Sequence, residues 1–358
     1  MREEHVTHAI RRRELLAGAV VAAVGVGLAP VAASASTRKF PLPTTRELTV
    51  LVTGDAGTGE PAQYAVAAAA RRVAAEKGCS LALGLGDNLY LDGPESSDDD
   101  EFQTKFEQPN VGIDVPWLMI LGNHDVSGLM PGGGDGPARG DYEVAYHNSS
   151  QRWYMPDRYY SVPLPDGSPN PVVEFFALDS NPVASFLPQL DPRYTWNGPY
   201  MQQQREWLDA KLRESRAYWK IVLAHHPYIN NGPYGNAGEY NGVTLDDYAS
   251  GKHLKELYEE IVLGRADLIM SGHDHCSQIL APVRGTQQIV CGASSQTESG
   301  QSKVTNDFHW QDFSRRGFMT LSITATAITI DAYLVESSDP ATATATLAYT
   351  HTVGPRAG

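Results

Sequence analysis

Short apolar runs recur along the chain, and several of them end directly in a cluster of Gly, Asp, Asn or His residues. Runs of this length, bounded by turn-forming residues, are typical of buried β-strands. The strands predicted in this way cover residues 48–53, 81–85, 117–121, 221–224 and 268–270. Polar clusters therefore lie at the carboxyl ends of five predicted strands.

Between several of these strands the apolar spacing becomes helical. The helices predicted from it cover residues 61–77, 202–216 and 252–263. The first begins at Pro61 and stops before Gly78, and these residue types favour helix starts and ends. Because strands alternate with helices, the sequence predicts an α/β fold of βαβ units, with a sheet of substantially parallel character.

The C-terminal part of the chain has the pattern of antiparallel strands. Residues 321–325 and 328–334 each alternate apolar and polar positions, and the phase slips between them, as in a β-hairpin. A further strand is predicted within residues 342–352. We expect these strands to complete a second sheet that packs on the first. The Gly- and Pro-rich residues 127–142 predict a loop.

Ligands of parallel α/β sheets gather at the carboxyl ends of the strands. Since all five polar clusters follow strands at that end, we expect their side chains to meet at one edge of the sheet. The residues concerned are Asp55, Asp87, Asn88, Tyr90, Asn123, His124, Asp125, His225, His226, His273, Asp274 and His275. Random placement would not bring so many histidines into such short clusters.

These side chains form a mixed set of oxygen and nitrogen donors. Such a set suits Fe, Mn or Zn rather than a soft ion that prefers thiolates. The donors are too numerous for one ion, which indicates a pair. Two-metal sites hold their ions about 3.5–4 Å apart and clamp an in-line displacement, with a bound hydroxide as the nucleophile.

The chain has 42 acidic and 28 basic residues, a formal net charge of −14. This balance argues against nucleic acid as a partner, because binding to phosphates needs a positive surface that displaces counterions. A small anionic substrate would be repelled in the same way unless something local reversed the field. Two bound cations would reverse it.

The first 35 residues have the order of an export signal. Three arginines at 11–13 precede a mildly apolar run, and the small residues 33–35 follow it. The spacing of the arginines to the next leucines resembles a twin-arginine signal. Glycines and Pro30 dilute the run, so we expect residues 1–35 to be a removable twin-arginine-type signal peptide rather than an anchor. The mature protein would be secreted, periplasmic or held at the cell surface, without a membrane span.

The three cysteines, Cys79, Cys276 and Cys291, are too few and too scattered for a disulfide framework. We expect them to be small buried apolar residues, although one pair could still be bridged.

Five motifs stand in order along the chain: GDAG (54–57), GDNLY (86–90), GNHD (122–125), HHP (225–227) and GHDH (272–275). Together they resemble the calcineurin-like metallophosphoesterases. Tyr90, three places after Asp87, resembles the purple acid phosphatases of the small, tartrate-resistant type. The resemblance covers roughly residues 45–352. It implies a four-layer sandwich of two mixed β-sheets flanked by helices, as a single domain over 36–358.

The resemblance also implies roles for single residues. The seven metal ligands would be a ferric set of Asp55, Tyr90 and His275, a bridging Asp87, and a set of Asn123, His225 and His273 for a divalent Fe, Zn or Mn ion. The resemblance assigns the ligand to His225 rather than His226, because His225 stands two places before Pro227, as the family's histidine does. His124 would be an acid outside the metal ligands that protonates the leaving alkoxide or hydrogen-bonds the phosphate.

Four further residues are expected around these ligands. Asp125 and Asp274 would orient nearby imidazoles. His226 is expected to be a satisfied buried histidine behind the ligands or beside the substrate pocket. Some family members carry a second active-site histidine nine places after the ligand that corresponds to His225, and here that position is Tyr234. The segment 230–238 is therefore expected to shape the substrate pocket differently.

Three functions are compatible with this sequence. The favoured one is a secreted acid phosphomonoesterase, in which a metal-bound hydroxide attacks a small phosphate ester and His124 donates the proton. A metallophosphodiesterase or nucleotidase could use the same dinuclear core. A non-catalytic binding protein on the same scaffold is disfavoured, because all seven ligand positions and His124 hold competent residues. The oligomeric state is left open.

Overall fold

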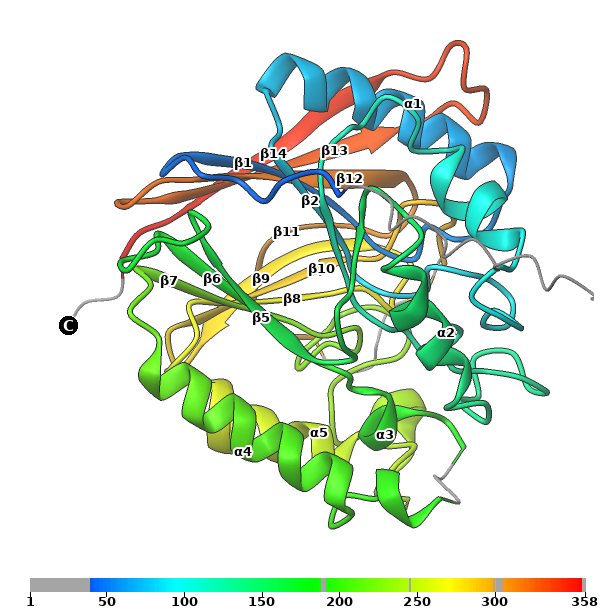
Figure 1. Cartoon of the computed structure of the whole chain (residues 1–358), viewed down its shortest axis with the longest axis vertical. Helices are drawn as coiled ribbons and strands as arrows, with labels where there is room; N and C mark the ends of the chain where they lie inside the picture. Colours follow the sequence, from blue (N-terminus) through cyan, green and yellow to red (C-terminus); the bar gives the residue numbers. More distant parts are fainter. Residues whose placement is uncertain (1–38, 188–190, 245, 299, 301–304, 356–358) are drawn as a thin grey trace, which may run out of the picture. The chain divides into compact units, whose positions relative to one another are not determined.

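The structure is a computed structural model that describes residues 39–187, 191–244, 246–298, 300 and 305–355. The predicted signal peptide lies outside the described residues. Within them the strands form two seven-stranded sheets (Figure 1). The first has the order β14-β13-β12-β1-β2-β3-β4, and the second has the order β11-β9-β10-β8-β7-β6-β5.

Both sheets are mixed. The first consists of β1 (Leu48–Thr53), β2 (Leu81–Gly84), β3 (Trp117–Met119), β4 (Trp153–Tyr154), β12 (Arg316–Ile323), β13 (Ile328–Val335) and β14 (Ala345–Val353). In it, β1 to β4 run parallel, and β12 to β14 are antiparallel to their neighbours. The second consists of β5 (Tyr160–Leu164), β6 (Val173–Ala177), β7 (Trp219–Leu223), β8 (Leu268–Ser271), β9 (Ser277–Val283), β10 (Thr286–Cys291) and β11 (Phe308–Asp312). Its central strands β6, β7, β8 and β10 are parallel.

Helices cover the outer faces of the two sheets, which gives four layers (Figure 1). The α-helices are α1 (Pro61–Lys77), α2 (Arg139–Tyr146), α3 (Asn181–Ala184), α4 (Pro199–Glu214) and α5 (Lys252–Leu257). Short π-helical and 3₁₀ segments are η1 (Gln103–Glu107), η2 (Pro192–Tyr194), η3 (Tyr240–Gly242) and η4 (Tyr258–Val262). Helix α1 packs on the first sheet, whereas α4, α5 and η4 pack on the second. In the described part of the chain, no helix is both long and apolar enough to cross a membrane.

The side chains of β6 point alternately to the two faces of the second sheet, and this shows how the layers are held together. Phe175 and Ala177 pack into the core between the two sheets, while Phe176 packs against the helices on the outer face. Successive strand residues point to opposite faces, so a strand that is apolar throughout must be covered on both sides. The continuous apolar runs of the sequence are explained by this double cover.

The predicted C-terminal hairpin is confirmed, but its place was predicted wrongly. Strand β12 pairs antiparallel with β1, and Leu48 lies opposite Ile323. The hairpin therefore extends the first sheet instead of completing a second one. An alternating pattern identifies the buried face of a strand, but it does not identify the strand that pairs with it.

Other boundaries differ from the sequence predictions by a few residues. The predicted loop at 127–142 ends early, because α2 begins at Arg139. Helix α4 begins three residues before its prediction, where Pro199 occupies the first turn. The third predicted helix continues past Leu257 only as a π-helical turn. Cys79, Cys276 and Cys291 are free, and the last two are buried.

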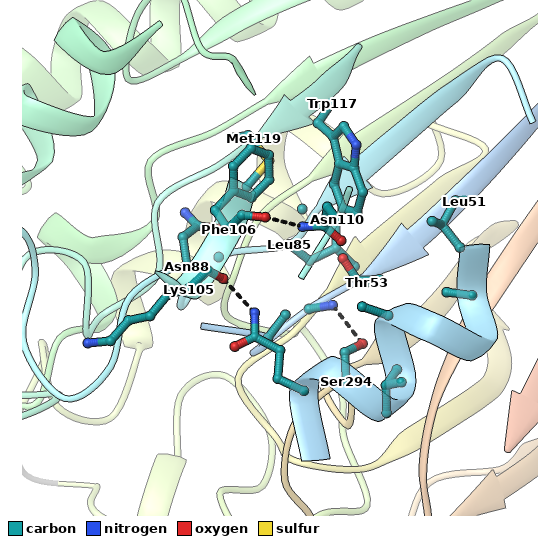
Figure 2. A pocket seen from close by; sticks show the side chains of 18 residues that line it. Leu51, Thr53, Leu85, Asn88, Lys105, Phe106, Asn110, Trp117, Met119 and Ser294 are labelled. Carbon is teal, nitrogen blue, oxygen red and sulfur yellow. Dashed lines mark hydrogen bonds between the residues drawn. The ribbon is translucent and has the colours of Figure 1, made fainter. Parts of the chain in front are cut away.

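Figure 2 shows a cavity between α1 and the first sheet, beside Leu51, Phe106 and Trp117. Its lining is mainly apolar, and none of the seven predicted metal ligands belongs to it. About 30 Å³ of it is open to water-sized groups, which is room for little more than a water molecule. We therefore regard it as a packing cavity behind the strand ends.

A buried ion pair fixes the segment between β3 and β4 to the second sheet. Arg158 is 5% exposed, and its Nη1 lies 3.4 Å from Oδ2 of the buried Asp179, just after β6. Its Nε donates to Asp141 of α2 at 2.8 Å, and its Nη2 donates to the Pro137 carbonyl. This guanidinium therefore connects α2 and the preceding loop to the end of β6.

We predict that Arg158→Met lowers the free energy of unfolding by about 3–5 kcal/mol, because it leaves the Asp179 carboxylate buried without its cation. Arg193→Met is the matched control, since Arg193 pairs with Asp191 at the surface and solvent-exposed pairs contribute little to stability. Urea unfolding measures both. Equal effects of the two substitutions would contradict this account of Arg158.

Candidate metal centre

The five polar clusters meet in space, as the strand-end pattern predicts, but they come from two sheets. Asp55, Asp87 and Asn123 follow β1, β2 and β3 of the first sheet. His225 and His273 follow β7 and β8 of the second. The hydrogen bonds described below join the two groups, so the site lies where the strand ends of the two sheets face each other.

The backbone turns sharply where these strands end. Asp55, Asp87 and His273 have φ values of 56°, 51° and 69°, in a left-handed region that is uncommon for residues other than glycine. Gly122 passes so close to Asp87 that a Cβ on it would lie 2.2 Å from the Asp87 backbone nitrogen. Backbone in such conformations clusters at functional sites, where surrounding contacts hold it in place.

The first group of donors surrounds the Tyr90 hydroxyl. Tyr90 Oη lies 3.1 Å from Asp55 Oδ1, 2.9 Å from Asp87 Oδ2 and 3.1 Å from His275 Nε2. Ligand atoms of Asp55, Asp87 and His275 all lie within 4.8 Å of one another. These four residues are the predicted ferric ligands together with the predicted bridge, and their atoms converge on one point.

The second group surrounds the side-chain oxygen of Asn123. Asn123 Oδ1 lies 3.0 Å from His225 Nε2 and 3.0 Å from His273 Nδ1. Asp87 Oδ2 is 3.4 Å from the same His225 nitrogen. These are the predicted ligands of the divalent ion, and the Asp87 oxygen borders both groups.

Hydrogen bonds to backbone carbonyls orient His225 and Asn123 of this second group, so that their acceptor atoms face the site. His225 Nδ1 lies 2.8 Å from the Leu85 carbonyl; a carbonyl only accepts, so Nδ1 carries a proton and Nε2 is the ligating nitrogen. Asn123 Nδ2 donates to the Gly132 carbonyl at 3.0 Å, which points Oδ1 into the site. Oriented acceptors beside buried carboxylates fit a bound cation.

Burial and mutual charge set the protonation of the buried acids and His225. Burial raises the pKa of Asp55 well above its usual value. Burial acts in the same direction on Asp87, but the nearby His225 and His124 hold the pKa of Asp87 well below its usual value. Burial lowers the pKa of His225, yet Asp87 outweighs it and raises that pKa to about 10. Without a metal ion, a proton on His225 therefore takes the position of the cation.

Asp125 hydrogen-bonds the backbone of the segments that follow β2 and β3, and it does not bind an imidazole. Its carboxylate accepts from the backbone N–H groups of Asn88, Leu89 and Gly122 at 2.8, 3.0 and 2.7 Å. Asn88 in turn donates to Asp125 and to Glu143, at 3.0 Å each. The prediction that Asp125 orients a histidine is wrong, because its oxygens are occupied by these donors. Sequence analysis missed Glu143, a buried acid of α2 that no motif contains.

Asp274 likewise accepts hydrogen bonds from a neighbouring segment of the chain. It accepts from the side chain of Asn230 and, at 3.2 Å, from the backbone N–H of Tyr234. It therefore holds the segment 230–238 rather than an imidazole, which corrects the second prediction of this kind. The ring of Tyr234 lies 4.6 Å from the ring of His273, so this segment does border the ligands.

His226 is buried as predicted, but it is only half satisfied. Its Nδ1 lies 2.8 Å from the Ser180 hydroxyl, whereas Nε2 has no hydrogen-bond partner among the described residues. An unpaired buried polar group costs about 1–3 kcal/mol. Ser180 and Glu298, whose carboxylate lies 3.9 Å from His275 Nδ1, were both missed because they stand outside the strand-end motifs.

Comparison with known proteins places this site in a family. The family model described as calcineurin-like phosphoesterase matches residues 48–277. The chain belongs to the calcineurin-like phosphoesterase family. Purple acid phosphatase 4 of Arabidopsis thaliana is 29% identical over 81% of this chain and 81% of its own length. Tartrate-resistant acid phosphatase type 5 of Oryctolagus cuniculus is 27% identical over 71% of this chain and 75% of its own length.

Two solved structures share the fold of this chain. The purple acid phosphatase of yellow lupin superposes with a TM-score of 0.59 at 17% identity, over 88% of this chain and 55% of that one. GAP50, described as the anchor in the inner membrane complex of Plasmodium, superposes with a TM-score of 0.65 at 18% identity, over 87% and 90% of the two chains. The predicted resemblance and the two-sheet sandwich are confirmed: the chain is a calcineurin-like phosphoesterase, and purple acid phosphatases are among its relatives.

We predict that metal binding releases protons and tightens as the pH rises from 5 to 9. A metal ligand must be unprotonated, and His225, with its pKa raised to about 10, is protonated over most of this range. Calorimetric titration of Zn²⁺ into metal-free protein, in two buffers of different ionisation enthalpy, counts the protons. The His225→Gln variant should release about one proton fewer on metal binding. His253 packs on Trp196, and His253→Gln should release as many protons as the unmodified protein. Affinity that does not depend on pH would contradict this prediction.

Proposed function

We propose that the protein is an exported acid phosphomonoesterase that hydrolyses small phosphate esters at a dinuclear Fe(III)–M(II) centre, where M is Fe, Zn or Mn. The observation that carries the proposal is the position of Asp87. Its Oδ2 lies 2.9 Å from Tyr90 Oη and 3.4 Å from His225 Nε2, so this oxygen borders both donor groups, and Asp87 would be the ligand that the two ions share.

The chemistry of the two donor groups supports two different ions. The group around Tyr90 offers carboxylate and phenolate oxygens, which a hard trivalent ion prefers. The group around Asn123 offers an amide oxygen and two imidazoles, which suit a divalent Fe, Zn or Mn ion. When bound, the ion pair would activate a water molecule and neutralise charge on the phosphoryl group.

We take His124 as the residue that moves a proton at this site, and two of its contacts support this role. Its Nδ1 lies 2.6 Å from the Leu91 carbonyl, so Nδ1 keeps its proton and Nε2 is the nitrogen that gains or gives one. Its backbone N–H donates to Asp87 Oδ1 at 2.9 Å, which fixes the residue beside the predicted bridge. We infer that Nε2 of protonated His124 donates to the leaving alkoxide.

Tyr90→Phe tests the ferric assignment. A phenolate bound to Fe(III) absorbs visible light, so the oxidised protein should be coloured, and Tyr90→Phe should lose the band together with most of its bound iron. Tyr218→Phe is the control, because this tyrosine is 59% exposed and stands outside the motifs. Visible spectra and metal analysis measure both effects. A colourless protein that holds only zinc would contradict the ferric assignment.

His124→Asn tests the proton donor. We expect kcat to fall about 10²–10⁴-fold for alkyl phosphates, whose leaving group needs a proton, and clearly less for 4-nitrophenyl phosphate, whose leaving group does not. Metal content should stay unchanged. An equal loss for both substrates would show that His124 acts in another way.

The same assays separate the proposed function from the other two. Faster hydrolysis of a phosphodiester than of a monoester would favour a diesterase. Lack of hydrolysis of either ester by metal-loaded protein would favour a binding protein, and the fold alone does not decide between these possibilities. Export is supported by the order of residues 1–35, and identification of the mature N-terminus after expression in a host with a twin-arginine pathway would test it.

A further inference from the structure

A small pocket lies beside Asn123 and His273, two of the predicted ligands of the divalent ion. The rest of its lining consists of Gly132, Ala184, Phe186, His226, Tyr240, Asn241 and Ala249. About 30 Å³ of the pocket is open to water-sized groups. A cavity that holds a benzene-sized ring measures about 150 Å³, so this pocket suits one or two oxygen-sized atoms rather than a ring.

His226 lines this pocket and carries an unpaired polar atom, Nε2. Its side chain is fully buried, and its ring lies 4.5 Å from the ring of His273. Since Ser180 occupies Nδ1, the Nε2 edge is the polar part of the ring that is left for the pocket. Buried polar groups are nearly always hydrogen-bonded, so an unpaired one calls for an explanation.

The partners of Ser180 indicate which nitrogen of His226 carries the proton. The backbone N–H of His226 points to Ser180 Oγ at 3.4 Å, so this hydroxyl already accepts one hydrogen bond. His226 Nδ1, at 2.8 Å, is the acceptor that the described residues offer to the hydroxyl proton. A neutral imidazole has one donor and one acceptor nitrogen, and Nε2 is then the donor.

We propose that the Nε2–H group of His226 binds an oxygen atom of the phosphate ester that lies beside Asn123 and His273, which makes His226 a substrate-binding residue. This inference rests on the proposed function, because it takes the ester to bind at the divalent side of the centre. The oxygen belongs either to the phosphoryl group or to the alcohol part of the ester, and the chemistry of recognition is the same for both.

The test compares two substitutions that keep different edges of the imidazole. His226→Asn keeps a polar atom near Ser180 but has nothing at the position of Nε2, whereas His226→Gln carries its amide to that position. Inorganic phosphate is titrated into each metal-loaded protein by calorimetry. If the oxygen belongs to the phosphoryl group, His226→Asn should weaken phosphate binding about three- to tenfold, the range of one hydrogen bond, and His226→Gln should stay within about twofold.

If the oxygen belongs to the alcohol, phosphate binding should be unchanged. The KM of glycerol 2-phosphate should then rise about three- to tenfold in His226→Asn relative to that of ethyl phosphate. Ser180→Ala tests the same hydrogen bond without changing His226. Without the Ser180 hydroxyl, the imidazole proton of His226 can move from Nε2 to Nδ1, so this variant should change the same binding constants in the same direction as His226→Asn. Metal content and thermal unfolding are measured for every variant.

The proposal is wrong if His226→Asn and Ser180→Ala, with normal metal content, bind phosphate and discriminate between the two esters like the unmodified protein. It is also wrong if the unmodified protein binds no phosphate. Phosphate binding that weakens as expected, in a protein that hydrolyses no ester, would instead contradict the proposed function. If the protein hydrolyses esters but His226→Asn and Ser180→Ala leave the phosphate affinity and the KM values unchanged, only the role of His226 is contradicted.

Discussion

The buried carboxylate of Asp87 is the group on which the rest of the site depends. One of its oxygens lies between Tyr90 and His225, and the other accepts the backbone N–H of His124. A carboxylate at this depth is stable only with compensating partners. The left-handed turn after β2 and the close passage of Gly122 place it there. The two donor groups are thus joined through one side chain.

Charge compensation also explains how so acidic a chain can suit an anionic ligand. The net charge of −14 describes the whole chain, and charges on the surface are screened within about 10 Å in salt. The buried acids at the site are compensated locally, by a proton on His225 when no metal is bound. Bound cations would replace that proton and leave a positive local field.

Asp125 and His226 are both buried, but their hydrogen bonds differ. Asp125 is filled by backbone donors, so it holds two loops in place and has no free acceptor to offer. His226 is equally buried, yet its Nε2 has no hydrogen-bond partner among the described residues. Burial alone does not distinguish these roles, whereas a full account of the hydrogen bonds of each side chain does.

The sequence by itself determined the strand ends, helix α1 and the donor set, because strand length, helix caps and side-chain chemistry are local properties. It could not determine that β12 pairs with β1, or that the donors come from two sheets, since pairing depends on residues more than 200 positions apart. Glu143 and Ser180 lie outside all five motifs, and the HHP motif does not tell which nitrogen of His226 is left unpaired. Only the tertiary structure decided them, because hydrogen-bond satisfaction depends on neighbours that folding brings together from distant parts of the chain.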